Sequence, residues 1–477
     1  MYFSSEINIG NLRIGGANPV CVQSMTNTDT MDTYATVQQI QELVEAGCGL
    51  VRIATRNIKE AHNLKEIKSA LLKSGIVIPL VADVHFNPKI AEIAAKHVEK
   101  VRINPGNYYS TSGDNYLLEE KLLPLLKICK DHDTIIRIGV NHGSLSERML
   151  YDFGNTALGM VESLMEFVEV CKKHDFSNLV LSVKASNVKM MIEANLLLVE
   201  RLKEKNLFFP IHLGVTESGN EEEGRIKSAA GIGYLLSHGI GDTVRVSLAE
   251  KPVNEVPVAR MLVENYGTRL DNSLANTPEI LLINARNNLS KRPLVITNSN
   301  SSFSDISLSD NNGNDYMEIV IARFDYENYS FDKQIIAASV DVTNFLYNNQ
   351  IDGIHLQNNC NSEEKNAQIT LKILQVLGLR ISEAEYIACP TCARTSIDLV
   401  NCLTDLKKQT SHFIGLKFAV MGCAINGPGE MADSDYGILG VGNNVVSLYK
   451  GKEVVIKQVP IEKAVSELLD IIKENSG

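Results

Sequence analysis

The sequence contains no long hydrophobic run and no excess of positive charge. No stretch of about 18 or more apolar residues occurs, which is the length that a membrane-crossing helix needs. The formal net charge is −11, whereas a general nucleic-acid-binding surface requires a basic stripe. We therefore expect neither a membrane-spanning helix nor a nucleic-acid partner.

The first residues also lack the features of an export signal. Residues 1–10 contain no basic region followed by an apolar stretch, so we predict no signal peptide and a cytoplasmic protein. The nine cysteines are irregularly spaced along 477 residues, which is not typical of a disulfide framework. Metal binding or free buried thiols are favoured instead, and the length predicts two or three domains.

A repeating pattern of strand and helix is present in the first 263 residues. Short β-branched, apolar runs recur, and each is followed by a helical pattern. In the first such helix, Asp32 is a plausible N-cap and Gly47 lies where a C-cap glycine belongs. An open doubly wound sheet is the alternative, but no G-x-G-x-x-G follows the first run. Eight units predict an α/β fold with an N-terminal (β/α)8 TIM barrel. The predicted strands are Pro19–Met25, Leu50–Ile53, Ile78–Asp83, Lys100–Ile103, Thr134–Ile138, Leu179–Lys184, Phe209–Leu213 and Asp242–Ser247.

Two further segments follow the predicted barrel. Residues 264–375 form an insert in which Glu318–Ala322 and Ile351–Leu356 are expected strands and Ile335–Leu346 an expected helix. Its Asn/Ser/Asp-rich stretch Thr297–Asp315 is expected to be a mobile linker, so the insert is predicted to be partly disordered. Residues 376–477 predict a small α+β domain. Its expected strands are Tyr386–Ala388, Leu416–Met421, Gly437–Val441 and Glu453–Val459, and its expected helices are Thr395–Lys408 and Ile461–Ile472.

Three cysteines of the third segment follow predicted strands. Cys389 and Cys392 form a C-x-x-C, and Cys423 comes directly after the next strand. The turn Gly427-Pro428-Gly429 could bring Glu430 back beside Cys423. Three thiolates suit a [4Fe–4S] cluster with one iron weakly held, or zinc with one more ligand, or no metal at all. Cys402 lies on a predicted helix and is expected to be a buried thiol.

Polar and charged residues lie at the C-terminal ends of the apolar barrel strands, which form the catalytic face of such barrels. Buried cations require a compensating partner, so the arginines and the lysine on one face of an acidic protein predict an anionic ligand, preferably a diphosphate. For any single arginine, pairing with a carboxylate of the next loop is the alternative. The residues of this set are Arg52, Asp83, His85, Arg102, Asn104, Arg137, Asn141, Lys184, His212, Glu217, Arg245 and Ser247.

Seven motifs resemble those of the 4-hydroxy-3-methylbut-2-enyl diphosphate synthase family, in the family's order. They begin at Val22-Gln-Ser-Met, Val81-Ala-Asp-Val-His, Val101-Arg-Ile-Asn-Pro-Gly-Asn, Arg137-Ile-Gly-Val-Asn, His212-Leu-Gly-Val-Thr-Glu, Cys389-Pro-Thr-Cys and Gly422-Cys-Ala-Ile-Asn. The resemblance covers roughly three quarters of the chain. It implies a barrel that binds 2-C-methyl-D-erythritol 2,4-cyclodiphosphate and a C-terminal ferredoxin-like (sulfite-reductase-like) domain with a [4Fe–4S] cluster.

The resemblance also implies roles for individual residues. Cys389, Cys392 and Cys423 would hold the cluster, with Glu430 as displaceable fourth ligand and acid. Asp83, His85, His212 and Glu217 would line the reacting end of the site, and the other strand-end residues would hold the diphosphate. The implied partners are a ferredoxin or flavodoxin as electron donor and a second copy in a homodimer. Other family members carry a larger domain at the insert, so this insert resembles a reduced version.

Two alternatives to this enzyme remain open at the level of sequence. One is a barrel lyase or aldolase for a phosphorylated sugar with structural zinc, and the other is a non-catalytic iron–sulfur sensor. A sensor would not need the cationic strand ends.

Overall fold

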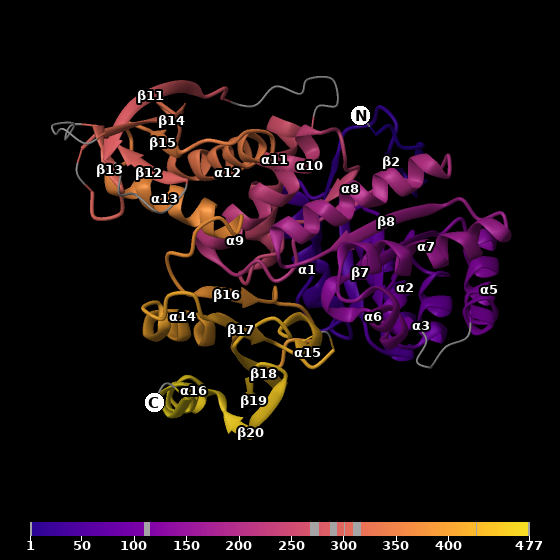
Figure 1. Ribbon diagram of the computed structural model, residues 1–477. Coiled ribbons are helices and arrows are strands. Elements are labelled where there is room, and N and C mark those ends of the chain that lie inside the picture. Colours follow the sequence, from indigo (N-terminus) through magenta and orange to yellow (C-terminus); the bar gives the residue numbers. More distant parts are fainter. Residues whose placement is uncertain are drawn as a thin grey trace.

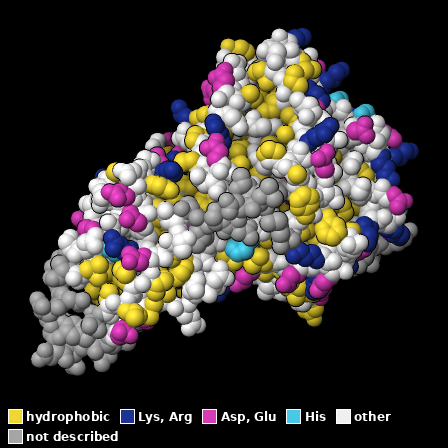
Figure 2. Space-filling model, turned by 90° about the horizontal axis from the view of Figure 1, so that it is seen from above, with side chains coloured by type: hydrophobic (Ala, Val, Ile, Leu, Met, Phe, Trp, Pro, Cys, Tyr) yellow, Lys and Arg dark blue, Asp and Glu magenta, His cyan; other side chains and the backbone are white. Residues whose placement is uncertain are grey.

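The computed structural model of the chain describes residues 2–108, 115–267, 276–286, 293–299, 301–308, 316–425 and 427–475. It consists of a barrel, an insert and a C-terminal unit (residues 376–477). In Figure 1 the barrel lies to the right, the insert at the upper left and the C-terminal unit below them. No helix among the described residues is long and apolar enough to cross a membrane. Side chains of both charge signs are interspersed over the face in Figure 2.

Eight parallel strands form the predicted barrel. Their order in the sheet is β8-β7-β6-β5-β4-β3-β10-β9, and a parallel bridge between Leu181 and Ile211 joins its two ends. All eight strands predicted from the sequence are confirmed. They are β3 (Cys21–Met25), β4 (Leu50–Thr55), β5 (Leu80–Val84), β6 (Lys100–Ile103), β7 (Ile135–Asn141), β8 (Leu179–Lys184), β9 (His212–Leu213) and β10 (Thr243–Val244).

The surrounding helices show the predicted end signals. The Asp32 side chain accepts a hydrogen bond from Ala35 N at the start of α1, and Gly47 follows the helix with φ of +102°. The helical elements of this part are α1 (Thr33–Glu45), α2 (Ile58–Lys73), α3 (Pro88–Ala94), α4 (Pro105–Tyr108), α5 (Asn115–Asp131), η1 (His142–Ser144), α6 (Glu147–Phe153), α7 (Ala157–Lys173), α8 (Val188–Glu204), α9 (Glu221–Ser228), η2 (Ala229–Gly233), α10 (Tyr234–Ser237), η3 (Pro252–Asn254) and α11 (Glu255–Tyr266).

An antiparallel hairpin that the sequence analysis did not assign closes the N-terminal end of the barrel. Its strands are β1 (Ile7–Ile9) and β2 (Leu12–Ile14). Ile9 and Ile14 are fully buried and pack against residues from the starts of the barrel strands, including Leu50 and Val81. The hairpin therefore leaves the C-terminal end as the open end of the barrel.

The insert is a folded layer whose core is continuous with that of the barrel. Its sheet order is β11-β14-β15-β12-β13, and Phe324 and Ile335 belong to the same buried cluster as the barrel helices. The predicted strands and helix are confirmed. The elements are β11 (Glu279–Arg286), β12 (Leu294–Thr297), β13 (Ile306–Ser307), β14 (Tyr316–Asp325), α12 (Phe331–Asn348), β15 (Gly353–Gln357) and α13 (Glu363–Val376).

The predicted mobile linker, Thr297–Asp315, is described only in part. Ile306–Ser307 pairs in parallel with β12, so this portion is strand rather than unstructured linker. Residue 300 and residues 309–315 lie outside the described residues. The sequence analysis missed β13 because this strand has only two residues, and two residues are too few to show the apolar–polar alternation of a strand.

The C-terminal unit is the predicted α+β fold. Its five strands follow the order β16-β17-β18-β19-β20, with the first three parallel and the last three antiparallel. The helix predicted from Thr395 begins later, at Leu399, because Asp398 is its N-cap and accepts from Asn401 N. The elements are β16 (Glu385–Ala388), α14 (Leu399–Thr410), β17 (Lys417–Met421), α15 (Gly427–Glu430), β18 (Tyr436–Gly442), β19 (Val445–Lys450), β20 (Glu453–Pro460) and α16 (Ile461–Asn475).

Helix α9 of the barrel contacts both of the other parts. Glu222 accepts from Lys365 at 2.6 Å and Lys372 at 2.8 Å, both on helix α13 of the insert. The neighbouring Glu223 pairs with Lys227 of α9 at 2.8 Å and with Lys407 of the C-terminal unit at 3.0 Å. These ion pairs place the insert and the C-terminal unit against one helix of the barrel.

Candidate functional site

The open end of the barrel and the C-terminal unit enclose one cavity of about 870 Å³, a volume that includes open solvent. Its walls come from the ends of the barrel strands and from the loops after β16 and β17. The predicted residues that line it are Arg52, Asp83, His85, Arg102, Arg137, Asn141, Lys184, Glu217, Arg245, Ser247, Cys389, Cys392, Cys423 and Glu430. Strand ends and cysteine loops predicted separately from the sequence therefore face the same space.

Two predicted residues of the described chain do not line this cavity. His212 is fully buried behind Lys184, with its Nε2 3.1 Å from Lys184 Nζ and its Nδ1 2.7 Å from Thr243 Oγ1. Asn104 donates to Ser144 Oγ and accepts from Gly106 N, which makes it a support for the loop after β6. His212 therefore supports Lys184 and Asn104 supports Ser144, and neither residue lines the cavity.

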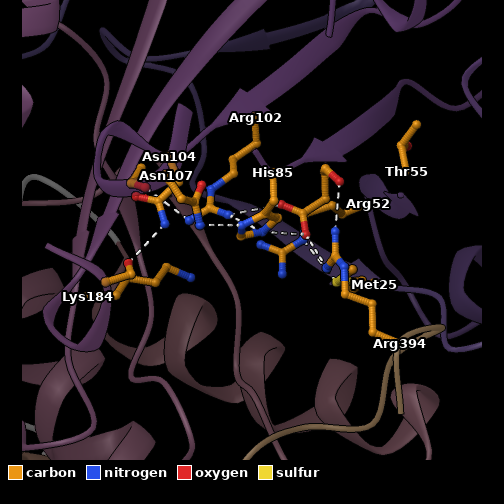
Figure 3. Close-up of polar contacts among 12 residues, drawn as sticks. Met25, Arg52, Thr55, His85, Arg102, Asn104, Asn107, Lys184 and Arg394 are labelled. Carbon is orange, nitrogen blue, oxygen red and sulfur yellow. Dashed lines mark hydrogen bonds and ion pairs between the residues drawn. The ribbon is translucent and has the colours of Figure 1, made fainter. Parts of the chain in front are cut away.

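Asp83 is the acidic centre of a cationic network. Arg102 Nη1 lies 3.3 Å from Asp83 Oδ1 and 2.7 Å from His85 Nε2, and its Nη2 donates to Gly139 O. From the other side, Arg394 of the C-terminal unit donates to Asp83 Oδ2 at 2.8 Å and to Asp83 O at 2.9 Å. Figure 3 shows Arg394 entering from its own loop toward Arg102 and His85, which come from the barrel.

The pKa values in this network follow from burial and charge. Burial alone would raise the pKa of Asp83, but Arg52 and Arg394 outweigh it and hold this pKa well below its usual value. Burial lowers the pKa of His85 to about 3, so the imidazole is neutral. Asp83 is therefore a permanent counter-ion at neutral pH, and His85 is a neutral hydrogen-bonding group.

Arg245 is paired with a carboxylate. Its Nε and Nη2 each lie 3.1 Å from a different oxygen of the buried Glu255, and this forms a bidentate ion pair. Glu255 also accepts from Ser24 Oγ and Leu248 N. For this arginine, the alternative of pairing with a nearby acid is confirmed, although Arg245 also lines the cavity.

Other cations of the cavity lack an acidic hydrogen-bond partner among the described residues. Arg137 is 1% exposed, and its Nε and Nη1 have no hydrogen-bond partner there. Burial, followed by the nearby Arg52, holds the pKa of Arg137 well below its usual value, and burial likewise lowers the pKa of Arg52 to about 10. Lys184 contacts the neutral His212, and burial lowers its pKa strongly. A bound anion would compensate these groups.

Glu217 and Glu430 form a pair of buried carboxyl groups at the junction. Burial raises the pKa of both, and repulsion from Glu217 raises that of Glu430 further, well above its usual value. Glu217 has a φ of +48°, which is an uncommon conformation for a residue other than glycine. Asn141 and Arg102 favour the ionised form of Glu430. The protonated form is nevertheless favoured for Glu430.

The three predicted ligand cysteines share one wall of the cavity with Glu430. Gly422 N donates to Cys389 Sγ at 3.1 Å, and burial raises the pKa of Cys389 well above its usual value. Among the described residues, no three His, Cys, Asp or Glu side chains lie close enough together to bind a single metal ion. Three thiols from two loops around an open cavity instead fit a cofactor larger than a single ion, such as a metal cluster bound by thiolates.

A backbone contact brings Glu430 to the cavity. A Cβ placed on Gly429 would come within 1.5 Å of Gly143 O, and one placed on Gly143 would come within 2.4 Å of Glu430 N. Only glycine permits this approach between the loop after β7 and the turn before Glu430. Glu430 and Cys423 line the same cavity, and the predicted turn Gly427-Pro428-Gly429 is part of the short helix α15.

Sequence reasoning missed two important members of the site, Arg394 and Glu255. Arg394 follows Cys392 by two positions, so a cation directly after a C-x-x-C was the available signal. Glu255 lies eight residues after Ser247, at the start of α11, and its pairing with Arg245 has no local signature. Thr395 supports the cysteine loop, because its hydroxyl accepts from Cys392 N.

Comparison with known proteins agrees with this geometry. The GcpE TIM-barrel domain model matches residues 4–260, and the GcpE protein C-terminal domain model matches residues 385–474. The chain belongs to the GcpE family. The segment between the two matches contains the insert.

Curated relatives of the GcpE family match the whole chain. A protein of Phocaeicola vulgatus is 38% identical over 99% of this chain and 97% of its own length, and one of Bacteroides thetaiotaomicron is 36% identical over the same shares. Both are named 4-hydroxy-3-methylbut-2-en-1-yl diphosphate synthase (flavodoxin). Their alignments span 599 and 597 positions, so these relatives carry residues that this chain of 477 lacks. A solved N-acetylneuraminic acid synthetase from Leptospira borgpetersenii (TM-score 0.37, 17% identity, 55% of this chain and 90% of that chain) is too distant to carry an argument.

Proposed function

We propose that this site reduces 2-C-methyl-D-erythritol 2,4-cyclodiphosphate to 4-hydroxy-3-methylbut-2-enyl diphosphate. One observation carries the proposal: the cationic strand ends and the three thiols face each other across a single cavity. The names of the full-length relatives support this oxidoreductase over a lyase or aldolase with structural zinc. The product belongs to the methylerythritol phosphate route of isoprenoid biosynthesis.

Arg52, Arg137 and Lys184 would hold the diphosphate, together with Arg102, Arg245, Asn141 and Ser247. The first three lie in the cavity with no acidic hydrogen-bond partner in the described chain. A bound phosphate would therefore form its most stabilising ion pairs with these three residues. Arg102 and Arg245 already have carboxylate partners, and they would share their charge with the substrate. Asn104 and His212 would act through Ser144 and Lys184.

Cys389, Cys392 and Cys423 would hold a [4Fe–4S] cluster, with Glu430 as a displaceable fourth ligand. When bound, such a cluster would supply two electrons one at a time, and we propose a flavodoxin as the donor because the relatives' names include it. A ferredoxin is the other candidate donor. The cysteine loops place these thiols beside the carboxyl groups and the cations of the barrel.

The chemistry requires a proton as well as electrons. The C–O bond to the ring phosphate breaks, and a hydroxyl group leaves as water once it has taken up a proton. The protonated form of Glu430 is favoured, because burial and repulsion from Glu217 raise its pKa well above its usual value, and burial also raises the pKa of Glu217. We propose Glu430 as the donor, with Glu217 as its partner. Asp83 and His85 keep the guanidinium of Arg102 in place.

The sequence-level expectations of three domains (1–263, 264–375 and 376–477), a homodimer and a cytoplasmic location remain part of the proposal. Size-exclusion chromatography with light scattering tests the dimer. The chemistry proposed for the site depends neither on the oligomeric state nor on the domain boundaries.

Anaerobic purification tests the proposed cofactor. We expect a brown protein with about four irons and four sulfides per chain. Cys389→Ser, Cys392→Ser and Cys423→Ser should each remove the iron–sulfur absorbance and the activity. Cys402→Ser is the matched control, because this thiol is buried on α14 among apolar residues. A Cys423→Ser protein with a full cluster and normal turnover would rule out the assignment.

A further inference from the structure

Arg394 connects the cysteine loop (residues 389–396) to the barrel. Its side chain is 8% exposed, and it donates to the carboxylate of Asp83 at 2.8 Å and to the backbone oxygen of the same residue at 2.9 Å. The two residues are 311 positions apart in the sequence. Figure 3 shows Arg394 reaching from its loop into the group of barrel side chains.

The same guanidinium lines the cavity together with Cys392 and Cys423. Arg394 follows Cys392 by two positions on the cysteine loop, and its side chain contacts Asp83 of the barrel. Arg394 therefore joins the barrel carboxylate to the cysteine wall of the cavity. In the proposed function above, neither substrate binding nor proton transfer uses this residue.

We propose that Arg394 is a positioning residue that holds the cysteine loop on the barrel through Asp83 and keeps a positive charge beside the group the thiols bind. The first half of this inference concerns the protein alone. The second half rests on the proposed function, because it requires a bound iron–sulfur cluster. A nearby cation stabilises the reduced, more negative state of such a cluster, so removal of the charge makes reduction harder.

Arg394, after Arg52, is among the cations that hold the pKa of the buried Asp83 well below its usual value. Arg102 contacts one of its oxygens and Arg394 the other, so one carboxylate joins the anion-binding strands to the cysteine loop. A second contact with the same loop comes from Arg56, whose Nη1 donates to Ala393 O at 2.7 Å. Arg56 is more exposed, at 33%, and it is paired with Glu60 and Asp29.

Hydrogen exchange of the iron-free protein tests the positioning role. Arg394→Gln should speed amide exchange in residues 389–396 at least tenfold while the barrel strands exchange as in the wild type. Asp83→Asn should have a smaller effect, because the backbone oxygen and one side-chain oxygen can still accept. Because both changes break the same contact, the double variant should be no faster than Arg394→Gln alone.

Redox titration of the loaded protein tests the charge. Arg394→Gln should shift the midpoint potential to a more negative value and lower kcat more than it changes KM. Arg394→Lys keeps the positive charge but cannot form both hydrogen bonds to Asp83. Its midpoint potential should therefore equal that of the wild type, while amide exchange in residues 389–396 should remain faster than in the wild type. Arg56→Gln is the matched control: it releases one contact of the same loop and should leave the potential unchanged.

Each result decides one part of the inference. Wild-type exchange of residues 389–396 in both Arg394→Gln and Asp83→Asn would overturn the positioning role. An unchanged midpoint potential in Arg394→Gln would overturn the role of the charge. If the wild-type protein assembles no cluster, the proposed function fails, whereas the exchange experiment on iron-free protein still stands on its own.

Discussion

The cations of the cavity differ in what compensates their charge. Arg245 has a buried carboxylate partner in Glu255, and Arg102 has one in Asp83. Arg137 has two buried nitrogens without a hydrogen-bond partner among the described residues. An unpaired buried cation costs folding stability, which the protein recovers only when an anion binds. This difference predicts opposite effects of two similar substitutions.

Arg137→Met should leave the melting temperature of the substrate-free protein unchanged or raise it, because it removes an uncompensated charge. It should weaken binding of the cyclic diphosphate about ten- to hundredfold, the effect of losing about 1.5–3 kcal/mol. Arg245→Met should lower stability by about 3–5 kcal/mol because it leaves Glu255 buried and unpaired. Thermal unfolding and calorimetric titration measure both. Equal destabilisation by the two substitutions would contradict this distinction.

Glu430 should matter for turnover and not for binding. Glu430→Gln keeps the shape of the side chain but removes its transferable proton, so it should bind the cyclic diphosphate as the wild type does and lose most of kcat. Arg102→Ala should instead raise the apparent KM, because in the proposed site Arg102 would contact the phosphate in both the ground state and the transition state. Anaerobic steady-state kinetics with a chemical reductant distinguish them. Wild-type turnover by Glu430→Gln would show that this glutamate is not the acid.

At the scale of elements, single helices and turns hold the C-terminal unit on the barrel. Helix α9 contributes Glu223, whose pKa is lowered to about 2 because Lys227 and Lys407 outweigh the opposing effect of burial. A carboxyl whose pKa is depressed on folding contributes stability above its unfolded pKa, near 4.5, and that contribution is lost as the pH falls toward 2.

Glu223→Gln should therefore destabilise the protein by about 2–3 kcal/mol at pH 7. The difference in melting temperature between variant and wild type should shrink as the pH falls from about 4.5 toward 2. Thermal unfolding over this pH range measures the effect. A difference that stays constant with pH would mean that the ion pairs of Glu223 do not account for it.

The contact between Gly143 and Gly429 is the second connection at this scale. Gly429→Ala should push the turn before Glu430 away from the barrel, because its Cβ would overlap Gly143 O. We expect a loss of at least tenfold in kcat with normal iron content. Gly75→Ala is the control for backbone strain without overlap, because nothing lies within 4 Å of this site but its φ is +74°; it should cost stability and leave kcat unchanged. Normal kcat in Gly429→Ala would show that this close approach is not required.

Local sequence pattern predicted most elements, and its failures have physical reasons. The barrel strands and α1 were predictable because apolar periodicity and capping residues are local. Strand β19 was missed, although Asn443 and Asn444 both have positive φ and form a hairpin turn that the sequence could have indicated. The pairs Arg394–Asp83 and Arg245–Glu255 depend on how loops meet in space, which no local pattern contains.

At the scale of the whole molecule, one chain supplies both walls of its cavity. The C-terminal unit contacts its own barrel through a bridge between Ser218 and Ala388, and Lys227 donates to Tyr386 O nearby. The insert lies between the two family matches and packs on the same barrel helix. The insert, which the sequence analysis interpreted as a reduced version of a larger domain in other family members, thus accompanies a cavity that one chain completes.

Product analysis after anaerobic turnover tests the central claim most directly. The loaded enzyme, reduced flavodoxin and 2-C-methyl-D-erythritol 2,4-cyclodiphosphate should give a linear allylic diphosphate and one water, with two electrons consumed per product. Mass spectrometry identifies the product, and oxidation of the flavodoxin counts the electrons. Cleavage of the substrate without electron consumption, or no consumption of the cyclic diphosphate by a protein with a full cluster, would contradict the account.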